Sequence, residues 1–195
     1  MHPQQTTFTP YEVLLFTDAE MILAKNNIMQ KMIGFFGRLS DKFQAVASAL
    51  PGGLLTASPK ISKGEQYLGL PYVVLDYPRN FTQQHMLAIR SFFWWGNHFS
   101  IHLLLSGTHR QHYQPKLQKV FENGGLNNYY IGLGDNPWNH HFMPGNYLPA
   151  SQVNDPFSDT KEFIKIAKKI PLLKWDEAEK FFIESFDEIT GWLAN

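Results

Sequence analysis

The chain contains no cysteine among its 195 residues. This absence excludes disulfide bonds, thiol catalysis and zinc sites built on thiolates. A metal ion would therefore need histidine and carboxylate ligands. A chain of this length buries roughly 70% of the surface that its unfolded form exposes, so its core does not depend on cross-links. We expect one domain over residues 1–195.

The chain also lacks a charge surplus of either sign. Lysine and arginine together number 17, and aspartate and glutamate together number 17, so the formal net charge is zero. Proteins that bind nucleic acid usually carry an excess of cations that displaces counterions from phosphates. We therefore expect no nucleic-acid partner. A net charge near zero removes one barrier to self-association and is compatible with a homodimer.

Long apolar runs are missing as well. No run approaches the roughly 20 residues that span a bilayer. The first residues, Met1 to Gln5, lack the basic start and the apolar stretch of a signal peptide. We therefore expect no membrane partner and a cytoplasmic location.

Motifs that would identify a reaction are absent too. The sequence has no Gly-x-Ser-x-Gly nucleophile elbow, no phosphate-binding Walker sequence and no His-Glu-x-x-His zinc motif. Gly132-x-Gly134 follows a predicted strand, but Asp135-Asn136-Pro137 follows in place of the helix that a dinucleotide loop requires. Catalytic residues, cofactor and metal therefore stay unassigned, and so does the question of whether the protein is an enzyme.

Capping residues and apolar periodicity predict helices at the N-terminus. Thr9-Pro10-Tyr11-Glu12 combines a helix cap, a proline at the first helical position and a capping-box glutamate, and Thr17–Glu20 repeats the capping pattern. Apolar residues spaced by three and four then continue to Leu50, where Pro51-Gly52-Gly53 ends the run. We expect a short helix followed by a longer one.

The same spacing predicts two C-terminal helices separated by Pro171. The apolar face of the first contains Phe163, Ile166 and Ile170, and that of the second runs from Ala178 to Leu193. The first helix is basic and the second acidic, which we interpret as solvated faces with weak surface pairing rather than a functional helical hairpin. The basic face contains Lys161, Lys165, Lys168 and Lys169.

Between the helices, β-branched and aromatic residues predict strands over residues 72–77, 87–105 and 128–133, with a short helix over 114–121. Gly96-Asn97 favours a two-residue hairpin turn within the second segment. That turn pairs Trp95 with His98, Phe93 with Ser100 and Ser91 with His102 on one face. A one-residue slip would exchange the two faces. The opposite face, expected on the core side, contains Phe92, Trp94, Phe99, Ile101, Leu103 and Leu105.

Residues 134–157 show no helical or strand period, and they contain four prolines and only two charged residues. Long ordered loops in compact domains are often functional. Because the aromatic side chains of this loop need cover, we expect it to fold over the face with Trp95, His98, Ser100 and His102. We expect Trp138 to be buried there, and any pocket at that contact to be lined by imidazole, hydroxyl and indole groups rather than charge.

Histidine is concentrated in the same region, because seven of the eight histidines lie between residues 85 and 141. Imidazoles serve as metal ligands and as acid–base groups. On one strand, however, His98 and His102 lie about 13 Å apart, and the neighbours His140 and His141 point to opposite sides of an extended segment. We therefore favour structural or surface histidines over a metal site.

Together these features predict an α+β fold, with N-terminal and C-terminal helices packed on a mainly antiparallel central sheet of about four strands. Our leading hypothesis for function is a soluble, non-catalytic binding or assembly protein with an aromatic, histidine-rich, charge-poor surface or pocket, taking a second copy or a small molecule as partner. The alternative is a His-based hydrolytic enzyme, with or without a metal. The candidate ligand-binding residues are Trp95, His98, Ser100, His102, Trp138, His140 and His141.

Overall fold

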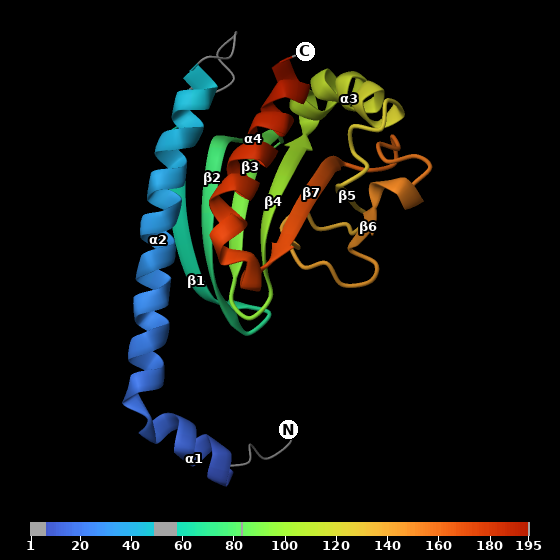
Figure 1. Ribbon diagram of the computed structural model, residues 1–195. Coiled ribbons are helices and arrows are strands. Elements are labelled where there is room, and N and C mark those ends of the chain that lie inside the picture. Colours follow the sequence, from blue (N-terminus) through green and yellow to red (C-terminus); the bar gives the residue numbers. More distant parts are fainter. Residues whose placement is uncertain (1–6, 49–57, 83, 195) are drawn as a thin grey trace.

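In the computed structural model, which describes residues 7–48, 58–82 and 84–194, helices cover one face of a twisted antiparallel sheet (Figure 1). The sheet has seven strands in the order β1-β2-β3-β4-β7-β5-β6. In chain order the elements are α1 (Pro10–Thr17), α2 (Ala19–Ser48), β1 (Lys60–Tyr67), β2 (Leu70–Phe81), β3 (Met86–Trp94), β4 (His98–Ser106), α3 (Gly107–Glu122), β5 (Tyr130–Gly132), β6 (Tyr147–Pro149), the 3-10 helix η1 (Ala150–Gln152), β7 (Phe163–Pro171), the 3-10 helix η2 (Leu172–Glu177) and α4 (Ala178–Ala194).

The α+β class, the antiparallel sheet and the flanking helices are confirmed, but the prediction of about four strands is wrong. The largest error is β7, which was predicted as a basic helix. Phe163, Ile166 and Ile170 have helical spacing, yet Ile164 and Ile166 face Leu105 and Leu103 of β4 across a strand ladder. The segment forms a strand because side chains two residues apart point to the same face of a sheet, which buries both isoleucines against the helices.

The helix-covered face of the sheet forms the main core. α2 contributes the predicted apolar stripe, and its Phe43 stacks on Phe186 of α4 with ring centroids 3.9 Å apart. Phe36 meets Phe182 edge to face at 5.6 Å. Such aromatic pairs add to the area term that holds α2 and α4 on the sheet. The predicted helix stop at residues 51–53 lies outside the described residues.

The N-terminal helices start close to where they were predicted. Thr9 and Glu12 form a complete capping box at the start of α1. At the start of α2 the predicted cap Thr17 ends α1 instead, and Asp18 Oδ1 accepts a hydrogen bond from the backbone N–H of Glu20 at 3.0 Å. α1 and the part of α2 before the buried Met29 extend beyond the end of the sheet (Figure 1). No described helix is both long and apolar enough to cross a membrane.

The β3–β4 hairpin is present, but its predicted register is wrong. Trp94 pairs with His98, so the turn holds Trp95, Gly96 and Asn97, and Gly96 takes the left-handed conformation with φ +70°. His102 consequently pairs with Arg90. The two-residue turn would have placed Arg90 on the face that the helices bury. The three-residue turn places Arg90, Phe92 and Trp94 on the face of His102, so the prediction that Phe92 and Trp94 lie on the core side is wrong.

Candidate functional site

The segment between β5 and β6 crosses the second face of the sheet, the one away from the helices. The His140 ring lies 4.5 Å from that of His102 and 5.2 Å from that of Phe92. The Phe142 ring lies 5.1 Å from that of His98. The prediction that this loop folds over the face bearing His98, Ser100 and His102 is therefore confirmed. Within the loop, however, β6 and η1 supply regular structure that the sequence did not indicate.

An ion pair lies at the centre of this contact. Asp76 on β2 and Arg90 on β3 are cross-strand neighbours. Arg90 Nε donates to Asp76 Oδ1 at 2.7 Å and Nη2 donates to Oδ2 at 2.8 Å, which is bidentate geometry. Arg90 Nη1 lies 2.9 Å from His140 Nε2. Because a guanidinium only donates, His140 Nε2 must accept this hydrogen bond.

His102 is held from two sides. Its Nε2 lies 2.8 Å from Ser100 Oγ, and its Nδ1 lies 2.8 Å from the Tyr147 hydroxyl. Burial lowers the pKa of both His102 and His140 well below the usual 6.5, and the nearby cations Arg90 and Lys165 act in the same direction. Burial raises the pKa of Tyr147 well above 10. The cluster therefore holds neutral imidazoles and an intact phenol.

Lys165 of β7 fixes the loop in place. The side chain is 1% exposed, and its Nζ donates to the carbonyl oxygens of Asn136 and Asn139 and to Asn146 Oδ1, at 3.2, 2.9 and 3.2 Å. Burial lowers the pKa of Lys165 to about 8. The prediction that this lysine belongs to a solvated helix face is wrong, because the strand turns it inward to three loop acceptors.

The remaining predicted site residues lie in different places. His98 is buried against Trp94 and Phe142, and burial lowers its pKa to about 4. His141 is half-buried at the edge of the cluster, where its backbone N–H donates to the Tyr67 hydroxyl. Trp95 is in the hairpin turn and packs toward the helix-side core, so it does not share the face of His98.

Trp138 is 42% exposed, so the prediction that it is buried is wrong. One face of its ring contacts the Arg90 guanidinium, whose central carbon lies 4.7 Å from the ring centroid. The Phe81 ring lies 5.7 Å away, edge to face. A cavity of about 710 Å³ opens beside these two rings, and Asp135 and Glu162 also line it. The prediction of a pocket at the contact with His98, Ser100 and His102, lined by imidazole, hydroxyl and indole groups rather than charge, is wrong for this cavity: none of these three residues lines it, and two carboxylates do.

The structure thus brings together Ser100, His102 and His140, with His98 beside them. Among the residues that the structure describes, no three histidine, aspartate or glutamate side chains are grouped so that they could hold a metal ion. Sequence reasoning missed Asp76, Arg90 and Lys165 as parts of the cluster. A signal for the first two was available, because Arg90 is the one charge of β3 and Asp76 follows the apolar run Tyr72–Leu75 of β2.

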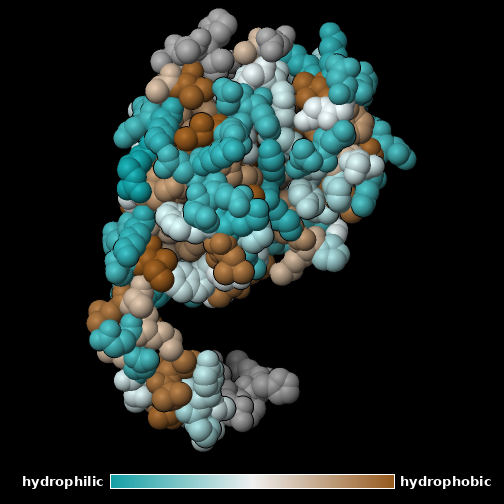
Figure 2. All heavy atoms as spheres, in the orientation of Figure 1, coloured by the Kyte–Doolittle hydropathy of each residue, from teal (hydrophilic) through white to brown (hydrophobic). Residues whose placement is uncertain are grey.

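A second candidate surface lies on the part of the chain that extends beyond the sheet. We call residues 8–28 the N-terminal arm. No residue of α1 is buried, and Figure 2 shows hydrophobic side chains along the arm down to its tip. Nine large apolar side chains of the arm are at least 40% exposed: Phe8, Tyr11, Val13, Leu14, Phe16, Met21, Ile22, Leu23 and Ile28.

Charge on the arm is sparse and partly engaged. Glu12 accepts hydrogen bonds from Thr9 within the capping box, and Lys25 pairs with Glu65 of β1 at 2.5 Å. A long apolar surface with so few free charges is unusual for a monomer in water.

The chain matches no protein-family model, no curated protein and no solved structure. The buried cluster, the Trp138 cavity and the N-terminal arm are therefore the features that bear on function.

Proposed function

We propose that this is a non-catalytic assembly protein that associates with a second copy of itself through the N-terminal arm. The observation that supports this is the set of nine exposed apolar side chains between Phe8 and Ile28. A helix that is apolar on all sides needs cover on all sides. α1 has this character, since its only charged residue, Glu12, is folded back onto Thr9.

The exposed area fits a dimer. At roughly 150–250 Å² for an aromatic side chain and somewhat less for an aliphatic one, with exposed fractions from 40% to 70%, the arm presents on the order of 900 Å². A standard interface buries about 800 Å² on each partner. An isologous dimer uses the same surface on both copies, so it covers both arms at once. The zero net charge adds no repulsion between copies.

Sedimentation velocity at micromolar concentration tests the proposal. We expect the wild type to sediment as a dimer, at twice the chain mass of 22.5 kDa. The variant Leu14→Ser/Phe16→Ser should be monomeric, because it removes two of the most exposed apolar groups of α1. Met143→Ser is the matched control, since Met143 is 51% exposed but lies outside the arm. A monomeric wild type would contradict the proposal.

The Trp138 cavity favours a second candidate function, the binding of a small organic cation. The open side of Trp138, the neighbouring Phe81 and the carboxylates of Asp135 and Glu162 are groups that attract a positive charge. The Arg90 guanidinium packs on the opposite face of the indole, so the buried cluster orients this side chain. Calorimetry should show binding of choline but not of its neutral isostere 3,3-dimethyl-1-butanol, and Trp138→Leu should abolish it. Equal heats for the two compounds would argue against this site.

The alternative of a His-based hydrolytic enzyme has less support. It requires His98, His102, His140 or His141 to meet a substrate. Both nitrogens of His102 and Nε2 of His140 already lie within hydrogen-bond distance of Ser100, Tyr147 or Arg90. Three further nitrogens, His98 Nε2, His140 Nδ1 and His141 Nδ1, have no hydrogen-bond partner among the described residues, and all three atoms are buried. The cytoplasmic location and the absence of nucleic-acid partners stay predictions from the sequence.

A further inference from the structure

An apolar cavity lies at the root of the N-terminal arm. It has a volume of about 280 Å³ and lies between α2, the β3–β4 hairpin and η2. Its apolar lining consists of Ile28, Met32, Phe93, Phe99, Leu172 and Trp175. The core side chains Met32, Phe93 and Phe99 are 5% exposed or less, so the cavity opens directly from the main core to solvent.

Two exposed apolar side chains stand beside this cavity on η2, next to the charged residues Lys174, Asp176 and Glu177. Leu173 is 97% exposed and Trp175 is 47% exposed, and η2 has no buried residue. In Figure 2 this underside of the body faces α1 across open space. The chain therefore carries two unpartnered apolar surfaces that face each other across a gap: the arm and the underside of the body.

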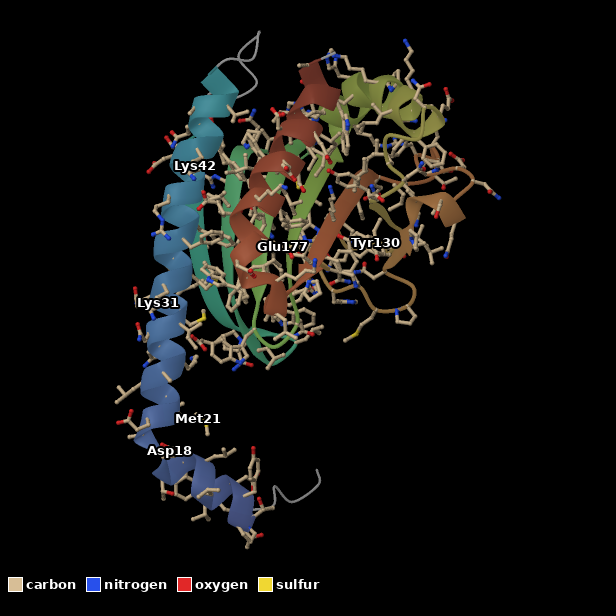
Figure 3. The ribbon with its side chains drawn as sticks, viewed as in Figure 1. Asp18, Met21, Lys31, Lys42, Tyr130 and Glu177 are labelled. Carbon is tan, nitrogen blue, oxygen red and sulfur yellow. The ribbon has the colours of Figure 1, made fainter. Side chains whose placement is uncertain are left out.

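The chain's own arm cannot fill the cavity. α2 is one continuous helix from Ala19 to Ser48, and Met21 lies about 16 Å along it from Met32, at 1.5 Å per residue. Figure 3 shows Asp18 and Met21 at the far end of this helix and Lys31 near the body. α1 begins beyond Asp18, so its side chains reach the cavity only if α2 breaks. Apart from Ile28, no described residue of the arm lines the cavity.

We propose that α1 of a second copy occupies this cavity, in a reciprocal exchange of arms; this rests on the arm-mediated dimer proposed above. The partner's α1 enters the space between body and arm, so that Leu14 or Phe16 fills the cavity while the opposite side of the helix contacts the receiving arm. This gives α1 the cover on all sides that its composition requires. In a dimer with two-fold symmetry, each arm fills the cavity of the other copy, so both arms and both cavities are occupied.

One charge lines the cavity. Lys31 is the one charged residue among those described that does so. α1 carries Glu12 and the adjoining bend carries Asp18 and Glu20, so the arm brings carboxylates to the Lys31 ammonium, while Lys174, Asp176 and Glu177 of η2 add no net positive charge around it. Opposite charges at a rim mainly fix the orientation of partners.

Disulfide trapping between two single-cysteine variants tests this contact cleanly, because the wild type has no cysteine. Leu14→Cys mixed with Lys31→Cys should give a cross-linked dimer under mild oxidation. Both positions are exposed, so neither variant should disturb folding. Leu14→Cys mixed with Lys42→Cys is the matched control. Lys42 is on the same helix eleven residues further along, beside the body in Figure 3, and should not cross-link.

The other outcomes separate the two proposals. If the protein is a dimer in which Leu14→Cys cross-links to itself and not to Lys31→Cys, the arms pair with each other, and the cavity contact is wrong while the dimer stands. A monomer that gives no cross-link overturns both. So does a monomer that co-sediments with vesicles of phosphatidylcholine and phosphatidylglycerol, because the arm would then bind lipid.

Discussion

Single residues of the buried cluster should control how the protein responds to acid. Burial lowers the pKa of His102 and His140 well below 6.5 in the folded state. Between pH 7 and pH 5 the unfolded chain therefore takes up protons at these positions and the folded chain does not. Protons then favour the unfolded state, so the free energy of unfolding falls as the pH falls, by up to about 1.4 kcal/mol per pH unit for each histidine below pH 6.5.

We expect His140→Gln to flatten this dependence, since glutamine can accept the Arg90 hydrogen bond but does not titrate. Urea unfolding at pH 7 and pH 5 measures the effect. Arg38→Met, a change on the exposed side of α2, is the control and should keep the wild-type dependence. Identical pH dependence in wild type and His140→Gln would mean that the pKa of His140 is the same in the folded and unfolded protein, against the lowering by burial.

At the scale of elements, the spacing of apolar residues predicted the helices and strands that bury one clear face. It failed where helical and strand spacing both fitted the sequence. The stripe of α2 and the β4 residues Phe99, Ile101, Leu103 and Leu105 were predicted correctly because each repeats over several turns or steps. β7 contains too few apolar residues to separate a period of two from one of 3.6. β1 is polar along most of its length because it is an edge strand, so its sequence resembles a loop.

The hairpin register shows how burial can override local turn chemistry. Gly96-Asn97 alone favours a two-residue turn. That turn would place Arg90 among the apolar side chains of the helix-covered core, whereas the three-residue turn places it on the second face beside His102, where His140 accepts a hydrogen bond from it. Burying a guanidinium in the apolar core would cost several kcal/mol. The cover of the His102 face by the loop was predicted from the apolar composition of the loop, but the packing of His140 on His102 was not. The anchoring by Lys165 depended on recognising β7.

At the scale of the whole molecule, the arm makes stability depend on concentration. A dimer that unfolds to two chains is stabilised by mass action, so its Tm rises with protein concentration. A tenfold increase in protein concentration raises the free energy of unfolding of the dimer by about 1.4 kcal/mol. With the usual entropy of unfolding for two chains of 195 residues, this corresponds to about 1–2 °C. We therefore expect the wild-type Tm to rise by about 3–6 °C over a thousandfold range of concentration.

Differential scanning fluorimetry on three proteins gives the decisive comparison. The wild type and Met143→Ser should show the concentration dependence, and Leu14→Ser/Phe16→Ser should show none, because its arm no longer holds two copies together. The buried core is the same in all three proteins, and Leu14, Phe16 and Met143 are all more than half exposed, so at the lowest concentration their Tm values should converge. A concentration-independent Tm in the wild type would show that the arm does not bind a second copy. Its apolar surface would then need another protein or lipid as its partner.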